Sequence, residues 1–147
     1  MRQIYNLFEP LGNASKVWLY LAERRLSDEE VRFTLENLSS FNATWSAHSK
    51  KLNSNATVLF NHIIVLAVDE TFEVASGCSI DSSVYAIKKI GAALNIDFFN
   101  RMNVLVQNES DFKLFPFTQI RRSKGINYLN PLVSTLGELR ENWIIQS

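Results

Sequence analysis

The fold is decided by one stretch of the chain, residues 56–69, which read ATVLFNHIIVLAVD. Branched aliphatic side chains fill its second half, and such a run is typical of a strand buried inside a sheet. We therefore predict one strand over 56–69 at the centre of a β-sheet. The polar residues Asp69, Glu70 and Thr71 then predict a tight turn into a further strand at 72–75, so that this section forms an antiparallel meander.

The segment before this strand predicts a strand and a helix. Residues 17–21, VWLYL, are aromatic and branched, which favours a strand. Ser27 and Glu30 have the spacing of a capping box, in which each side chain accepts a hydrogen bond from the other residue's backbone amide. A helix should therefore follow Ser27 and fade near Asn42. Its buried face is expected to hold Val31, Leu35 and Leu38. Residues 43–52 alternate loosely and predict a weak strand, with a turn at 53–55.

The segment after the central strand predicts two helices and two short strands. A loop over 76–80 should lead into a helix from Asp81 to about Leu94. Residues 104–106 predict a strand, and the Phe-rich segment 112–117 contains a proline, which places it at a sheet edge or in a loop. A last helix should begin at Asn130 and run to about Trp143, since proline follows Asn130 at the first helical position.

The composition indicates one globular domain. The chain has 147 residues, of which 46% are hydrophobic and 20% charged, and this length folds without a disulfide or a metal. Helices and strands do not alternate regularly along the chain. We therefore predict a single α+β domain over 1–147, with a mostly antiparallel sheet and helices packed on one face.

The balance of charges and the single cysteine indicate which binding partners and which cellular compartment to expect. Lys plus Arg and Asp plus Glu each number 15, so the chain has no long-range attraction to nucleic acid. The first ten residues lack the apolar core of a signal peptide, and the longest apolar run is too short for membrane insertion. With Cys78 as its single cysteine, the protein is expected in the cytosol. Neither a cofactor nor a metal is expected, because the two histidines and one cysteine have no zinc spacing.

The central strand ends in a pair of acidic residues that has the form of a Walker B segment. In ABC ATPases the aspartate at this position holds magnesium and the glutamate positions water. With residues 45–48 (WSAH) and 75–83 (ASGCSIDSS), the strand ending in Asp69-Glu70 resembles a group of short bacterial proteins often labelled "ABC transporter ATPase". The resemblance covers the middle third of the chain and implies no established activity.

The rest of the ATPase chemistry is missing from the sequence. A P-loop needs two glycines followed by Lys and Ser or Thr, because its backbone amides cradle the phosphates. The nearest stretch, residues 12–16 (GNASK), lacks the second glycine and precedes a predicted strand. ABC-type ATP hydrolysis is therefore not expected, and Asp69 and Glu70 are interpreted as turn residues.

The segment around Cys78 is the predicted location of a functional site. A glycine, a thiol and several hydroxyls lead into a helix, whose first amides are unpaired and can hold an anion. The candidate ligand-binding residues are Gly77, Cys78, Ser79, Asp81, Ser82 and Ser83. A simpler alternative has Ser79 or Asp81 capping the helix and Cys78 buried as a small apolar residue.

Two functions remain open from the sequence. The first is a non-catalytic protein that binds a protein partner or a small anionic ligand near 76–83; a homodimer through the sheet or through 112–117 is one form of it. The second is a small thiol-dependent enzyme with Cys78, His48 and Asp81 as catalytic candidates. His62, in the central strand, is interpreted as a core residue rather than a base.

Overall fold

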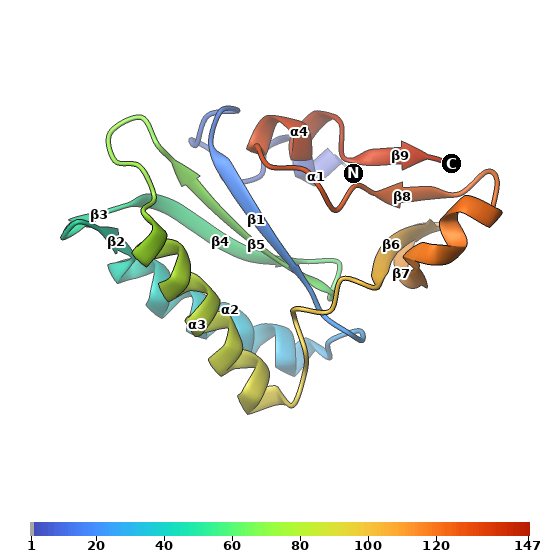
Figure 1. Ribbon diagram of the computed structural model, residues 1–147, viewed down its shortest axis with the longest axis horizontal. Helices are drawn as coiled ribbons and strands as arrows, with labels where there is room; N and C mark the ends of the chain where they lie inside the picture. Colours follow the sequence, from blue (N-terminus) through green and yellow to red (C-terminus); the bar gives the residue numbers. More distant parts are fainter. Residues whose placement is uncertain (1) are drawn as a thin grey trace.

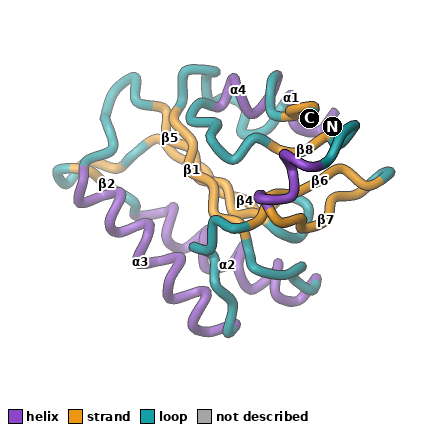
Figure 2. Tube along the Cα trace, turned by 45° about the vertical axis from the view of Figure 1, so that its right-hand side comes forward, coloured by secondary structure: helices purple, strands orange, loops and turns teal. Residues whose placement is uncertain are grey.

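The computed structural model describes residues 2–147 and has three layers (Figure 1). Helices α2 and α3 cover one face of a three-stranded sheet of order β1-β5-β4. A four-stranded sheet of order β7-β6-β8-β9, together with the short helices α1 and α4, covers the other face. Figure 2 shows the same separation after a 45° turn, with α2 and α3 side by side below the three-stranded sheet. The predicted α+β class, with antiparallel pairing and helices, is confirmed.

The bounds of the elements are as follows. The helices are α1 (Arg2–Tyr5), α2 (Asp28–Thr44), α3 (Gly77–Leu94), α4 (Leu136–Glu141) and the 3-10 helix η1 (Phe117–Arg122). The first five strands are β1 (Lys16–Leu21), β2 (Ser46–Ala47), β3 (Lys50–Lys51), β4 (Asn53–Leu59) and β5 (Ile63–Asp69). The remaining strands are β6 (Asn103–Asn108), β7 (Asp111–Pro116), β8 (Asn127–Leu129) and β9 (Ile144–Gln146).

Strand β5 is the centre of the structure, as predicted for the second half of 56–69. It pairs antiparallel with β1 and with β4, and residues 63–68 are all buried. Ile64, Leu66 and Val68 pack against α2 and α3, whereas the alternate residues pack against the second sheet. Because both faces of β5 are covered, its sequence is continuously apolar instead of alternating with polar residues.

The prediction of a single strand over 56–69 is wrong, because this stretch is a hairpin. β4 and β5 are joined at residues 60–62, and Leu59 lies opposite Ile63. Phe60 and Asn61 take left-handed conformations with φ of 56° and 55°. Asparagine tolerates that conformation, but phenylalanine does so rarely. The Phe60 ring packs against Phe112, with centroids 4.3 Å apart, so a tertiary contact holds a turn that local sequence does not signal.

The predicted strand at 72–75 is also wrong. Residues 70–76 form a loop between β5 and α3. Glu70 holds this loop, because its Oε2 accepts a hydrogen bond of 2.8 Å from the Ala75 amide. The predicted turn at 53–55 lies inside β4, and the weak strand over 43–52 is the small β2–β3 hairpin.

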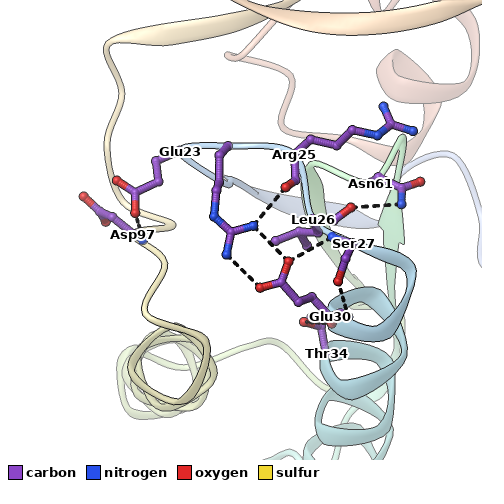
Figure 3. Close-up of polar contacts among 9 residues, drawn as sticks. Glu23, Arg25, Leu26, Ser27, Glu30, Thr34, Asn61 and Asp97 are labelled. Atoms are coloured by element: carbon purple, nitrogen blue, oxygen red, sulfur yellow. Dashed lines mark hydrogen bonds and ion pairs between the residues drawn. The ribbon is translucent and has the colours of Figure 1, made fainter.

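The capping box of α2 is confirmed. Ser27 Oγ accepts from the Glu30 amide at 3.1 Å, and Glu30 Oε1 accepts from the Ser27 amide at 2.9 Å. Arg24 reinforces this cap with two hydrogen bonds to the Glu30 carboxylate, of 2.9 and 2.7 Å (Figure 3). The predicted buried face is wrong at Leu35, which is 37% exposed, since the buried residues of the helix are Thr34 and Leu38.

Two predicted helix starts are wrong, although α3 ends at Leu94 as predicted. Helix α3 begins at Gly77, one turn before Asp81, with Ser76 as its N-cap. The last helix is only α4, capped by Thr135. Asn130 caps a tight turn instead, because its Oδ1 accepts from the Leu132 amide at 2.9 Å. The chain then runs beside β1, where the Val17 amide donates to the Ser134 carbonyl at 3.0 Å.

The strands predicted around 17–21 and 104–106 are confirmed as β1 and β6, and most of the segment 112–117 lies in β7 and not in a loop. β7 lies at an edge of the second sheet, as its proline suggests. None of the helices in the described part of the chain has the length and apolar character needed to cross a membrane.

Candidate functional site

The junction at 76–83 is the start of α3, and a serine that the sequence analysis did not select caps it. Ser76 Oγ accepts from the Ser79 amide at 3.1 Å, and the Ser79 hydroxyl donates to the Ser76 carbonyl at 2.8 Å. Ser79 and Asp81 both lie inside α3, after its N-cap Ser76, so the expectation that either of them caps the helix is wrong. The preference of serine for the position before a helix was the signal that pointed to Ser76.

The other hydroxyls of the junction bond to the backbone of their own helix. The Ser82 hydroxyl donates to the Cys78 carbonyl at 3.0 Å, and the Ser83 hydroxyl donates to the Ile80 carbonyl at 2.6 Å. Ser83 is buried beneath the helix, whereas Ser82 faces outward. Of the three predicted ligand hydroxyls, only that of Ser82 is therefore exposed on the outer face of α3.

Cys78 is exposed in the first turn of α3, so the alternative in which it is buried is wrong. His48 is exposed too, in the left-handed turn between β2 and β3, with φ of 52°. His62 lies at the start of β5 and Cys78 lies beyond its end. The 7 residues of β5 span roughly 20 Å at ~3.3 Å per residue, which separates these two groups.

His62 is a core residue, as the sequence analysis interpreted it. It is 3% exposed, and its Nδ1 lies 2.8 Å from the Phe60 carbonyl oxygen, which fixes the ring inside the β4–β5 turn. Burial lowers the pKa of His62 below its ordinary value. No group of three or more His, Cys, Asp and Glu side chains within the described residues is placed to hold a metal ion.

Asp69 and Glu70 hold the loop that follows β5. Asp69 Oδ1 accepts from the amide and the hydroxyl of Thr71, and these bonds lower the pKa of the Asp69 carboxyl. Glu70 forms an ion pair of 3.3 Å with Lys16 in addition to its bond to Ala75. Each carboxylate thus accepts a hydrogen bond from a backbone amide of the loop, as turn residues do.

A groove of about 720 Å³ lies between α2 and α3, where no site is expected from the sequence. Phe33, Asn37 and Phe41 form one wall, spaced by one helical turn each along α2. The lining from α3 consists of Asp81, Ser82, Tyr85, Ala86, Lys89, Ile90 and Ala93. Asp81 and Ser82 are the predicted ligand residues that the groove includes; Gly77, Cys78, Ser79 and Ser83 do not line it.

The groove combines an apolar floor with a polar rim. Phe33 is 36% exposed and Tyr85 is 66% exposed, so an aromatic ring stands on each side. Lys89 provides a positive charge on the rim, with its Nζ 5.7 Å from the centre of the Tyr85 ring. Such a surface can hold an aromatic or aliphatic group while Lys89 attracts an acidic one. The helical spacing of residues 33, 37 and 41 is visible in the sequence. The sequence does not show that this face of α2 lies beside α3.

A smaller concavity of about 490 Å³ lies at the far end of α3. Two of its lining residues bond to each other's backbone: the Glu23 amide donates to the Asp97 carbonyl at 3.0 Å, and the Asp97 amide donates to Glu23 Oε1 at 3.0 Å (Figure 3). These contacts attach the chain after α3 to the chain after β1. The two acidic residues of this concavity, Glu23 and Asp97, therefore have a structural role.

The edge strand β7 has few free hydrogen-bond donors. The Phe112 amide donates to the Asp111 side chain at 2.8 Å, and Pro116 has no amide hydrogen. A second strand adding to this edge would lack partners for part of its ladder. This arrangement argues against a homodimer through 112–117.

Protein-family models, curated proteins and solved structures were all compared with this chain, and none of them matches it.

Proposed function

We propose that the chain is a non-catalytic binding protein whose recognition surface is the groove between α2 and α3. One observation carries the proposal: an apolar floor is open to solvent between two aromatic rings, Phe33 and Tyr85, and a lysine stands beside it. Exposed apolar surface of this kind is costly unless a partner covers it. The predicted binding region near 76–83 adjoins the groove through Asp81 and Ser82.

The chemistry of the groove indicates which kind of ligand it can bind. An aliphatic or aromatic group fits between Phe33 and Tyr85, and an acidic group on the same ligand would pair with Lys89. Two of the polar side chains are already bonded to their own helices, because the Ser82 hydroxyl donates to the Cys78 carbonyl and the Asn37 amide donates to the Phe33 carbonyl. The expected ligand is therefore amphipathic, with a protein segment or a small aromatic anion as its two forms.

The distribution of reactive groups favours binding over catalysis. A thiol nucleophile needs a base within hydrogen-bond reach. Cys78 lies in the first turn of α3 and His48 in the β2–β3 turn, and within residues 2–147 no hydrogen bond joins their side chains. His62, the other histidine, is buried at the opposite end of β5.

A fluorescent probe with the same chemistry tests the proposal. Anilinonaphthalene sulfonate carries aromatic rings and one negative charge. We expect it to bind the folded protein saturably with one site per chain, and to bind about tenfold more weakly to Phe33→Ser, a loss of ~1.4 kcal/mol. Lys89→Gln should weaken binding as well, because it removes the charge that attracts the sulfonate.

Leu35→Ser is the matched control. Leu35 lies on the same helix as Phe33 and is equally exposed, at 37% against 36%, but it does not line the groove. Its substitution should leave probe binding unchanged. Equal binding by both variants, or no saturable binding by the native protein, would contradict the proposed function. Near-UV circular dichroism establishes that each variant keeps its packed core, since loosely packed states also bind this probe.

A further inference from the structure

The outer face of α3 carries a symmetric pattern of charge. Asp81 and Lys89 lie about one turn before and one turn after Tyr85, and all three side chains are exposed on that face. At ~1.5 Å of rise per residue, each charge stands roughly 6 Å along the helix from Tyr85. A helix with opposite charges at equal distances from its centre is complementary to an antiparallel copy of itself.

We propose that the partner in the groove is the α3 helix of a second copy of this chain. The two helices run antiparallel, with Tyr85 at the two-fold axis. Asp81 of each copy then meets Lys89 of the other. The inference rests on the proposed function, because the outer ridge of one α3 enters the α2–α3 groove of its partner.

Both charges are available for such pairs. The ion pairs formed among the described residues join Lys16 to Glu70, Arg24 to Glu30 and Arg25 to Asp111, so neither Asp81 nor Lys89 is in an intramolecular ion pair. A parallel arrangement would bring like charges together, which costs energy and selects the antiparallel one. The equal numbers of basic and acidic residues also mean that two copies do not repel each other at long range.

The neighbouring positions fit the same arrangement. Cys78 and Ala92 lie about two turns before and after Tyr85, so the two-fold places Cys78 of one copy against Ala92 of the other. Both side chains are small and exposed. Because both side chains are small, the two helices can remain in contact at positions two turns from the axis. Phe33, on the opposite wall of the groove, would be covered by the incoming helix.

Charge reversal tests the pairing. In sedimentation equilibrium the native chain should be a dimer at micromolar concentration. Saturating anilinonaphthalene sulfonate should shift it toward the monomer, because the probe and the partner helix compete for the same groove. Lys89→Asp and Asp81→Lys should each raise the dissociation constant at least tenfold, because each sets like charges against each other. The double variant with both reversals restores opposite pairs, and its dissociation constant should return to within about threefold of the native value. A monomeric native chain, or a double variant no better than the single ones, overturns the proposal.

Crosslinking tests the register independently. With Cys78 retained, Ala92→Cys should give a disulfide-linked dimer on mild oxidation, because positions 78 and 92 face each other across the axis. The native chain should not crosslink, since its two Cys78 thiols lie about four turns apart, roughly 20 Å. The control combines Ala92→Cys with Cys78→Ser and should stay uncrosslinked. Efficient crosslinking of the control or of the native chain contradicts this register.

The outcomes separate this inference from the proposed function. If the native chain is a monomer yet binds the fluorescent probe in a manner that depends on Phe33, the groove is a recognition surface for another partner and the self-association fails alone. If the probe does not depend on Phe33 and the charge reversals have no effect, both proposals fail.

Discussion

The indole Nε1 of Trp45 donates a hydrogen bond of 2.8 Å to the backbone carbonyl of Ser79. This bond joins the residue that ends α2 to the first turn of α3, and Trp45 is only 3% exposed. Trp45 also packs against Phe41, with ring centroids 5.1 Å apart. The indole therefore sets the distance between the two helices at the end of the groove nearest Cys78.

Trp45→Phe should lower the free energy of unfolding by about 1–3 kcal/mol. The variant keeps an aromatic ring but loses the hydrogen bond and part of the buried surface. Urea denaturation measures the change. Hydrogen exchange should also quicken in the first turn of α3, while exchange in β5 should follow the change in global stability alone. Unchanged stability would show that the bond to Ser79 does not hold the helices together.

Gly91→Ala should destabilise the protein by about 1–3 kcal/mol. A Cβ at Gly91 would lie 2.5 Å from the Ile96 carbonyl oxygen, where the chain turns back after Asn95 to end α3. Gly77→Ala is the matched control in the same helix, because nothing lies within 4 Å of its added Cβ. The control should be neutral or stabilising by up to ~1 kcal/mol, since alanine is the better helix former. Equal thermal shifts in the two variants would contradict the close approach at Gly91.

The α2 cap should make stability depend on acid pH. Hydrogen bonds from Arg24 and from the Ser27 amide lower the pKa of Glu30 to about 2. Its folded pKa lies below the unfolded value, so the stabilisation is complete above pH ~4.3 and is lost as the pH falls toward 2. Glu30→Gln should flatten this part of the curve of melting temperature against pH. The effect is modest, because the group is near the surface. A native curve and a variant curve that stay parallel between these pH values would refute the assignment.

His62 should contribute a second pH dependence at a higher range. Burial holds its pKa below the ordinary value, so the unfolded chain takes up a proton at a pH where the folded chain does not. Stability is therefore complete above pH ~6.5 and declines as the pH falls below it. His62→Asn removes the titrating group, so the free energy of unfolding of the variant should no longer decline between pH ~6.5 and 5. Any loss of stability caused by the substitution itself should be the same at every pH in this range. A titration of the His62 ring followed by NMR gives the folded pKa directly, and a value at or above 6.5 would contradict the prediction.

Local signals in the sequence predicted the elements that depend on neighbouring residues. The capping box at Ser27 and Glu30 is complete within one turn, and a continuous apolar run predicts β5. The β4–β5 turn could not be found in this way, because Phe60 keeps its left-handed conformation while it packs against Phe112, a residue far along the chain. Local propensity predicts neither the contact between Phe60 and Phe112 nor the pairing of β4 with β5.

The candidate site was predictable only in part for the same reason. Asp81 and Ser82 were selected as residues at a helix start, and they do line the groove. Phe33 was not selected, because its role depends on which side of α2 lies beside α3. The sequence assigned Leu35 to the buried face instead, and the two side chains are about equally exposed. Deciding between them requires the packing of two helices on one sheet.

The central claim is that the groove between α2 and α3 is the recognition surface, and an NMR titration of the labelled protein with anilinonaphthalene sulfonate tests it most directly. The account predicts that the amide shifts concentrate at Phe33, Asn37 and Phe41 on α2 and at Ala86 and Lys89 on α3. Shifts that concentrate instead around Glu23 and Asp97, or that spread evenly over both sheets, would contradict it.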